Sequence, residues 1–270
     1  MFRHILAPVD FSPLSAAGLR YAAEFARCTQ GRITVLFANP FTPPPYFTQG
    51  KIEQMEQQYR EGMREAEAQL HRFAEEAIGE PRPDFGIQVV EALPVDGIMG
   101  AAANLGADLI TMGTHGRSGL NRFMLGSVAE RVIRQADIPV LTVRGGEGRP
   151  RIRSIICPVA ETVAPAAMAT AALLARCTGA SLRVLHVREH GAPDPLFPEG
   201  VEVMVREGDA AEQIVAASGD CDLLVIGSRH RRFFDTTVIG ATTARVVRHA
   251  RCPVLTVVEA EAGINSEAEA

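Results

Sequence analysis

Residues 138–143 read IPVLTV, and residues 252–257 read CPVLTV, 114 positions further along the chain. The same offset relates two pairs of glycines, Gly113 with Gly227 and Gly126 with Gly240. Earlier segments also recur in the same order: ILAPV (5–9) as IICPV (155–159), FARCTQGRITVL (25–36) as LARCTGASLRVL (174–185), and ADLITMG (107–113) as CDLLVIG (221–227). A repeat that keeps its order in this way predicts a tandem duplication of one folding unit.

Within the first copy, apolar β-rich runs alternate with segments whose apolar residues recur every three or four positions. Ser12 and Pro13 are typical of the cap and the first residue of a helix. The predicted strands are 4–9, 33–38, 86–91, 107–113 and 138–144, and the predicted helices are 12–30, 50–78, 95–105 and 127–136. Alternation of this kind predicts an α/β fold in which each copy holds a five-stranded parallel sheet flanked by helices.

The two copies predict two domains, at residues 1–146 and 151–258, joined by the Gly-, Arg- and Pro-rich stretch RGGEGRPRIR. The second domain is smaller, because a short loop replaces the long helix 50–78 of the first. The apolar stripe of that helix predicts a core-facing surface rather than a partner-binding one. Residues 259–270 are rich in acidic and small residues, which predicts a disordered tail.

The composition of the 270 residues is that of a globular protein, with 47% hydrophobic and 22% charged residues. No apolar run reaches the roughly 18 residues of a membrane span, and the N-terminal residues lack a signal-peptide pattern, so we expect a cytoplasmic protein without a membrane partner. The net charge of −5 argues against a nucleic-acid partner. Five scattered cysteines without a CxxC motif predict reduced core thiols.

Lys51 is the single lysine in the chain, so no P-loop sequence is present and a phosphate site must use backbone N–H groups, hydroxyls and arginine. The segment THGRSGLNRFMLGSVAE, after the predicted strand 107–113, offers such groups. Its glycines allow tight turns, and its last part opens a helix whose free N–H groups favour an anion. Arginines 117 and 122 and serines 118 and 127 add charge and hydroxyls. The alternative is an ordinary loop.

The spacing Gly113-x2-Gly116-x9-Gly126-Ser127, with Asp10 after an Ile-x-x-Pro-Val strand and the closing AERVIRQADIPVLTV, resembles the ATP-binding branch of the universal stress protein family. With the duplication, the resemblance covers nearly the whole chain. It implies two tandem Rossmann-like domains of the adenine nucleotide alpha hydrolase type, each with strand order 3-2-1-4-5. It also implies that ATP, with or without Mg²⁺, lies between the ends of the first and fourth strands.

Carried over to this sequence, the resemblance implies that Asp10 lies near the ribose or adenine and that the backbone of Ala38 contacts the adenine. The glycine loop would then hold the ribose and phosphates. The full set of implied ATP-binding residues is Pro8, Val9, Asp10, Ala38, Met112, Gly113, Gly116, Arg117, Gly126, Ser127 and Val128. Two alternatives remain open at the residue level: Asp10 as the N-cap of the first helix, and His115 as a phosphate contact or a solvent-facing side chain.

The second copy departs from this pattern, because Ala160, His230 and Ala241 replace Asp10, Gly116 and Ser127. We therefore expect it not to bind ATP in the same way, and we expect its arginines 229, 231 and 232 to form a solvated surface. His186 and His190 lack a third ligand and a helix to align them, so no metal site is predicted.

We expect a stress-response regulatory protein in which adenine nucleotide occupancy changes conformation or partner choice. The alternatives are a slow ATPase and a nucleotide-independent scaffold that binds another ligand or partner. A dehydrogenase-type module is disfavoured because no GxGxxG follows the first strand. Related single-domain proteins resemble dimers joined through the fifth strand, so the resemblance implies that the two domains pair within the chain, with a homodimer of chains as a further possibility.

Overall fold

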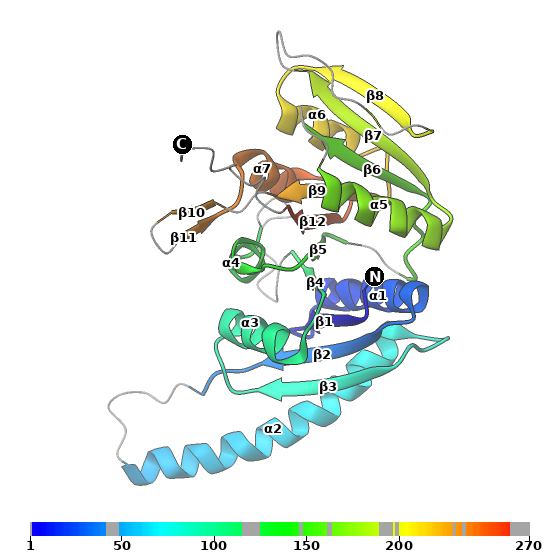
Figure 1. The fold of residues 1–270 in the computed structure, drawn as a ribbon. Helices are drawn as coiled ribbons and strands as arrows, with labels where there is room; N and C mark the ends of the chain where they lie inside the picture. Colours follow the sequence, from blue (N-terminus) through cyan, green and yellow to red (C-terminus); the bar gives the residue numbers. More distant parts are fainter. Residues whose placement is uncertain are drawn as a thin grey trace, which may run out of the picture.

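The computed structural model describes residues 2–41, 49–114, 125–145, 148–160, 164–188, 197, 200–228, 231–233 and 236–259 (Figure 1). Ten strands form one sheet in the order β3-β2-β1-β4-β5-β12-β9-β6-β7-β8. Their bounds are β1 His4–Pro8, β2 Arg32–Ala38, β3 Phe85–Val90, β4 Leu109–Gly113, β5 Val140–Val143, β6 Ser154–Val159, β7 Ser181–Arg188, β8 Glu202–Glu207, β9 Leu223–Ser228 and β12 Val254–Val258.

The predicted α/β fold with helices flanking parallel strands is confirmed, and each repeat has the strand order 3-2-1-4-5. Each repeat contributes five strands, but they do not form two separate sheets. Strands β5 and β12 pair antiparallel, which is the fifth-strand pairing that the resemblance implies, and they join the repeats into one sheet. Leu141 pairs there with its own repeat equivalent, Leu255, and Val140 and Thr142 pair with Thr256 and Val254. The two repeats are therefore related by an approximate twofold axis between Leu141 and Leu255.

Seven helices among the described residues cover the two faces of this sheet. Helices α1, α2 and α5 pack on one face, and α3, α4, α6 and α7 pack on the other, so each face has an apolar core that continues from one repeat into the next. The helices are α1 Pro13–Thr29, α2 Gln49–Ile78, α3 Pro94–Leu105, α4 Ser127–Gln135, α5 Pro165–Thr178, α6 Ala210–Ala217 and α7 Ala241–His249.

Helix α2 follows the predicted apolar stripe only in part. Its C-terminal part enters the core, where Leu70 and Ala74 are fully buried. The N-terminal part carries the half-buried Ile52, Met55 and Tyr59, and Figure 1 shows it extending past the sheet. The prediction of a stripe that faces the core over the whole helix is therefore wrong, because the sheet is shorter than the helix that crosses it.

Besides the strand pairing and the shared apolar cores, specific side-chain contacts among the described residues also join the repeats. Arg248 of α7 donates to Glu130 of α4 at 2.7 Å, and the Arg144 guanidinium donates to the backbone oxygen of Val247. Cys28 and Cys177 form a disulfide. The prediction that all cysteines are reduced thiols is wrong for this pair, since the strand junction brings together two cysteines that are 149 positions apart in sequence.

The loop after β9 holds a feature that the sequence did not predict. Strands β10 (Arg231–Phe233) and β11 (Thr236–Val238) form a two-stranded antiparallel hairpin where we expected a solvated basic loop. Between β7 and β8, the described residues contain no helix equivalent to α2, as the shorter second repeat predicts. Within the described ranges, no helix combines the length and the apolar character that a membrane crossing requires.

Candidate functional site

The strand order reverses direction between β1 and β4, which is where ligands bind in open parallel sheets. These strands pair with Ile5 opposite Leu109 and Leu6 opposite Ile110. The pairing places the ends of both strands, Pro8 and Gly113, at the same edge of the sheet. Val9 continues past β1 and donates its N–H to the backbone oxygen of Leu36 at 2.8 Å, while Met112 is buried at the end of β4.

Asp10 lies at this edge with a half-buried side chain. Its Oδ1 accepts the N–H of Ser12 at 3.1 Å. Ser12 is the N-cap of α1, since its Oγ accepts the N–H of Ser15 at 3.2 Å and Pro13 begins the helix. The N-cap role that was left open for Asp10 therefore belongs to Ser12. The Asp10 carboxylate instead orders the turn that leads from β1 into α1.

Gly113 has a packing role that is independent of any ligand. A Cβ atom there would lie 2.9 Å from both the carbonyl carbon and the Cβ of Leu14 in α1. Gly18 makes the second close approach, because a Cβ atom on it would lie 3.1 Å from the carbonyl carbon of Met112. Both glycines let α1 rest directly on the end of β4. Gly18 is absent from the predicted site, although its position inside a helix was a signal.

The N-terminus of α4 is held at the same edge by the backbone. Gly126 donates its N–H to the oxygen of Thr114 at 2.7 Å, and Thr114 is itself buried and donates to Val143 at 2.9 Å. Gly126 is the N-cap, without a side-chain cap, and the first helical bond runs from Glu130 N to Gly126 O at 2.9 Å. The N–H groups of the first turn, at Ser127 and the two residues after it, therefore have no acceptor within the helix.

These donors have the arrangement that an anion needs. Ser127 is exposed and Val128 is half-buried, so both N–H groups lie at the surface end of the helix. The N–H of Gly126 is already used by Thr114, which leaves Ser127 and Val128 of the predicted N–H donors. Ala129, which was not predicted, adds a third N–H in the same turn. The remaining predicted loop residues, Gly116 and Arg117 together with residues 115, 118 and 122, lie outside the described residues.

Ala38 ends β2, the strand next to β1, and so lies at the same edge. A Cβ atom on Gly97 of α3 would lie 3.0 Å from the Cβ of Ala38. Gly97 thus permits α3 to pack against the end of β2 and fixes the position of Ala38. Sequence reasoning missed this glycine.

In the second repeat, a carboxylate lies at the start of α5, the helix equivalent to α1. Glu259, just after β12, is 8% exposed and accepts the N–H groups of Ala166 at 3.1 Å and Ala167 at 2.8 Å, in the first turn of α5. A Cβ atom on Gly227, the equivalent of Gly113, would lie 3.0 Å from Glu259 Oε1. A buried carboxylate therefore caps α5 in the second repeat, where Ser12 caps the equivalent helix α1 in the first. Burial of the Cys157 thiol, together with the nearby Glu259 charge, raises the pKa of that thiol to about 12.

Glu259 was placed in the predicted disordered tail, and the structure corrects this for that residue. Its N–H also donates to the backbone oxygen of Ser228 at 2.9 Å. Residues 260–270 lie outside the described residues. The prediction failed because an acidic composition does not distinguish a solvated glutamate from one that caps a helix 92 positions earlier in sequence.

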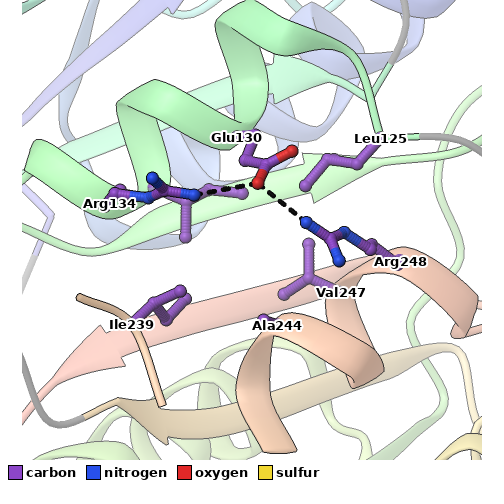
Figure 2. A pocket seen from close by; sticks show the side chains of 8 residues that line it. Leu125, Glu130, Arg134, Ile239, Ala244, Val247 and Arg248 are labelled. Atoms are coloured by element: carbon purple, nitrogen blue, oxygen red, sulfur yellow. Dashed lines mark hydrogen bonds and ion pairs between the residues drawn. The ribbon is translucent and has the colours of Figure 1, made fainter. Parts of the chain in front are cut away.

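A cavity of about 190 Å³ lies between the two repeats, on the face that carries α4 and α7 (Figure 2). Figure 2 shows Glu130 between two guanidinium groups, with Nη2 of Arg134 at 2.9 Å and Nη2 of Arg248 at 2.7 Å from the same carboxylate oxygen. The lining follows the approximate twofold axis in four repeat-equivalent pairs: Leu125 with Ile239, Glu130 with Ala244, Ile133 with Val247, and Arg134 with Arg248.

The side chains of the predicted arginine surface and one member of the histidine pair lie outside the described residues. Arg229, His230 and His190 lie outside the described residues, and only the backbone of Arg231 and Arg232 is described. His186 is buried, with Nδ1 3.3 Å from the backbone oxygen of Val159. Among the residues that the structure describes, no three His, Cys, Asp or Glu side chains are grouped as metal ligands would be.

Comparisons with known proteins agree with the fold. The sequence model of the universal stress protein family matches residues 1–144 and 196–258. A universal stress protein of Methanocaldococcus jannaschii is 32% identical over 151 residues, which cover 53% of this chain and 83% of that protein. A crystal structure of a universal stress protein from Archaeoglobus fulgidus matches with a TM-score of 0.66 at 24% identity, covering 96% of this chain and 97% of the other. A putative universal stress protein from Pseudomonas aeruginosa has a TM-score of 0.64 at 18% identity, with 96% and 94% covered.

Proposed function

This chain belongs to the universal stress protein family. We propose that its first repeat binds an adenine nucleotide, with ATP as the primary ligand, and that occupancy of this site regulates which partners the protein binds. One observation carries the proposal. The Thr114–Gly126 backbone bond holds the open first turn of α4 at the sheet edge where β1 and β4 end. A switch point of the strand order and an uncapped helix N-terminus therefore coincide, which is the usual place for a nucleotide phosphate.

Different residues of this edge would contact the phosphates, the ribose and the adenine. The N–H groups of Ser127 and Val128 and the Ser127 hydroxyl suit the phosphates, because the helix dipole favours negative charge there. Asp10, at the end of β1, is an acceptor for ribose hydroxyls, and the backbone of Ala38 borders the adenine. A bound Mg²⁺ would offset phosphate charge, and Asp10 is the described carboxylate at this edge that suits it.

The second repeat is proposed to be inactive toward ATP. Ala160 and Ala241 replace Asp10 and Ser127, so the second repeat lacks the ribose acceptor and the phosphate-binding hydroxyl proposed for the first. The Glu259 carboxylate, at the start of α5, adds a negative charge near the same edge of the sheet, which disfavours a triphosphate. The repeats would then divide their roles, with the first binding the nucleotide and the second completing the sheet through β12.

Calorimetric titration of the nucleotide-stripped chain with Mg-ATP tests the proposal. We expect one ATP per chain, and a loss of affinity of at least about 10-fold in Asp10→Ala and in Gly126→Val. Gly126 has φ −64° and ψ 148°, which valine also adopts, so this substitution adds bulk beside the phosphates without backbone strain. Gly240→Val, at the equivalent N-cap of α7 with φ −55° and ψ 142°, is the matched control and should leave the affinity unchanged.

The other outcomes separate the alternatives. Two ATP per chain would contradict the inactive second repeat. Absence of ATP binding would contradict the nucleotide proposal and favour the alternative of a nucleotide-independent scaffold. Phosphate release from the same samples, present in the parent chain and absent in Gly126→Val, would show that the site also hydrolyses ATP.

A further inference from the structure

The twofold relation between the repeats brings one pair of equivalent cysteines together. Cys28 is the next-to-last residue of α1, and Cys177 is the next-to-last residue of α5. Their Cα atoms lie 5.6 Å apart, inside the range that a disulfide requires, and the two residues are joined. They align in the repeated segments FARCTQG and LARCTGA, so each repeat contributes the same residue to one covalent link.

This link lies at the surface. Cys177 is exposed and Cys28 is half-buried, so a small thiol can reach the sulfur atoms. The other cysteines of the chain differ. Cys157 and Cys252 are buried, and the Sγ atoms of Cys221 and Cys252 lie 3.6 Å apart as two thiols. Because Cys28 and Cys177 are more exposed to solvent than Cys157 and Cys252, we expect this pair to exchange with thiols in solution.

The repeats do not depend on this bond to stay together. The β5–β12 pairing, the Glu130–Arg248 ion pair and the bond from Arg144 to Val247 all join them without sulfur. Breaking the disulfide would therefore leave the sheet assembled and free only the C-terminal ends of α1 and α5. The N-terminal ends of the same two helices border the Asp10 edge and the Glu259 carboxylate.

From this geometry we propose that Cys28 and Cys177 form a reversible exchange site for low-molecular-weight thiols and disulfides, which closes and opens a covalent clamp between the two repeats. In closing, the thiolate of one cysteine attacks a small disulfide, forms a mixed disulfide and releases one small thiol. The second cysteine then attacks the mixed disulfide and releases the second small thiol. Two protein thiols and one small disulfide thus become one protein disulfide and two small thiols, and the two electrons pass to the small disulfide.

The test equilibrates the full chain with mixtures of reduced and oxidised glutathione, alkylates the free thiols and maps the tryptic peptides. Cys28 and Cys177 lie in separate short peptides, CTQGR and CTGASLR, so their link is read directly and apart from the Cys221–Cys252 pair. We expect the linked peptide to predominate in oxidised glutathione, to disappear in excess reduced glutathione, and to pass between these states in one two-electron transition.

Thermal unfolding provides the second measurement. The oxidised chain should unfold roughly 5–10 °C above the reduced chain, and Cys177→Ser, at an exposed position, should show no such difference. Absence of the linked peptide at every glutathione ratio would overturn the proposal. Its persistence in excess reduced glutathione would also overturn it, because the bond would then be a permanent bridge. Equal unfolding temperatures in the linked and reduced states would refute the clamp. None of these outcomes depends on nucleotide binding.

Discussion

At the scale of single residues, close backbone approach decides the shape of the candidate site. Gly113 and Gly18 leave no room for a side chain between β4 and α1, and Gly97 leaves little between α3 and the end of β2. The glycine in the sequence motif thus has a structural reason to be there, besides any contact with phosphate. The two roles predict different outcomes when the residue is changed.

Gly113→Ala should lower the free energy of unfolding by about 1–3 kcal/mol, because the new methyl group would press on the Leu14 backbone at 2.9 Å. Gly100→Ala is the matched control. Gly100 lies inside α3 with nothing near its absent Cβ, so alanine there should raise the free energy of unfolding by about 0.5–1 kcal/mol. Urea denaturation measures both. Similar small effects would show that α1 does not pack closely on β4.

At the scale of elements, the equivalent helices α1 and α5 begin in different ways. Ser12 caps α1 from the adjacent position, as the sequence predicts. Helix α5 has Ala164 at its N-cap without a side-chain bond, and the Glu259 carboxylate from the end of β12 takes over the N–H groups of its first turn. The two equivalent helix starts are therefore both capped, by an adjacent residue in the first repeat and by a residue from the end of β12 in the second.

Glu259→Gln should lower the free energy of unfolding by about 1–3 kcal/mol. Each carboxylate oxygen of Glu259 accepts a backbone N–H, and the amide nitrogen that replaces one of them cannot accept a hydrogen bond. Ser12→Ala provides the comparison and should cost about 1 kcal/mol, the usual effect of losing a local cap. Chemical denaturation of the two variants beside the parent chain decides the point. An unchanged stability in Glu259→Gln would mean that the buried carboxylate does not hold α5.

At the scale of the whole molecule, the β5–β12 junction makes one ten-stranded sheet whose edges are β3 and β8. Both fifth strands are paired on both sides, so a homodimer of chains would need a surface other than the one predicted from single-domain relatives. The junction is not symmetric in charge. Glu130 contacts Arg248 across it, and its equivalent in the second repeat is Ala244.

Glu130→Ala should lower the free energy of unfolding by about 1 kcal/mol, since it removes the Glu130–Arg248 ion pair between the repeats and leaves the Arg134 and Arg248 guanidinium groups without their shared carboxylate. Arg134→Ala keeps the Glu130–Arg248 pair and should cost less than about 0.5 kcal/mol. Denaturation at low and at high salt measures the difference, which should shrink as salt screens the charges. A larger loss in Arg134→Ala than in Glu130→Ala would contradict this account.

The sequence by itself determined the duplication, the alternation of strands and helices, and the family, because a repeated order and a hydrophobic period are local patterns that survive without coordinates. Through the family resemblance, it also grouped Asp10, Ala38, Gly113 and Gly126 as residues of one candidate nucleotide site. Only the tertiary structure decided the antiparallel register of the junction between the two fifth strands, that Cys28 meets Cys177, and that Glu259 caps α5. Each of these depends on residues that are about 90 to 150 positions apart in sequence and meet only in the folded chain, so no local pattern reports them.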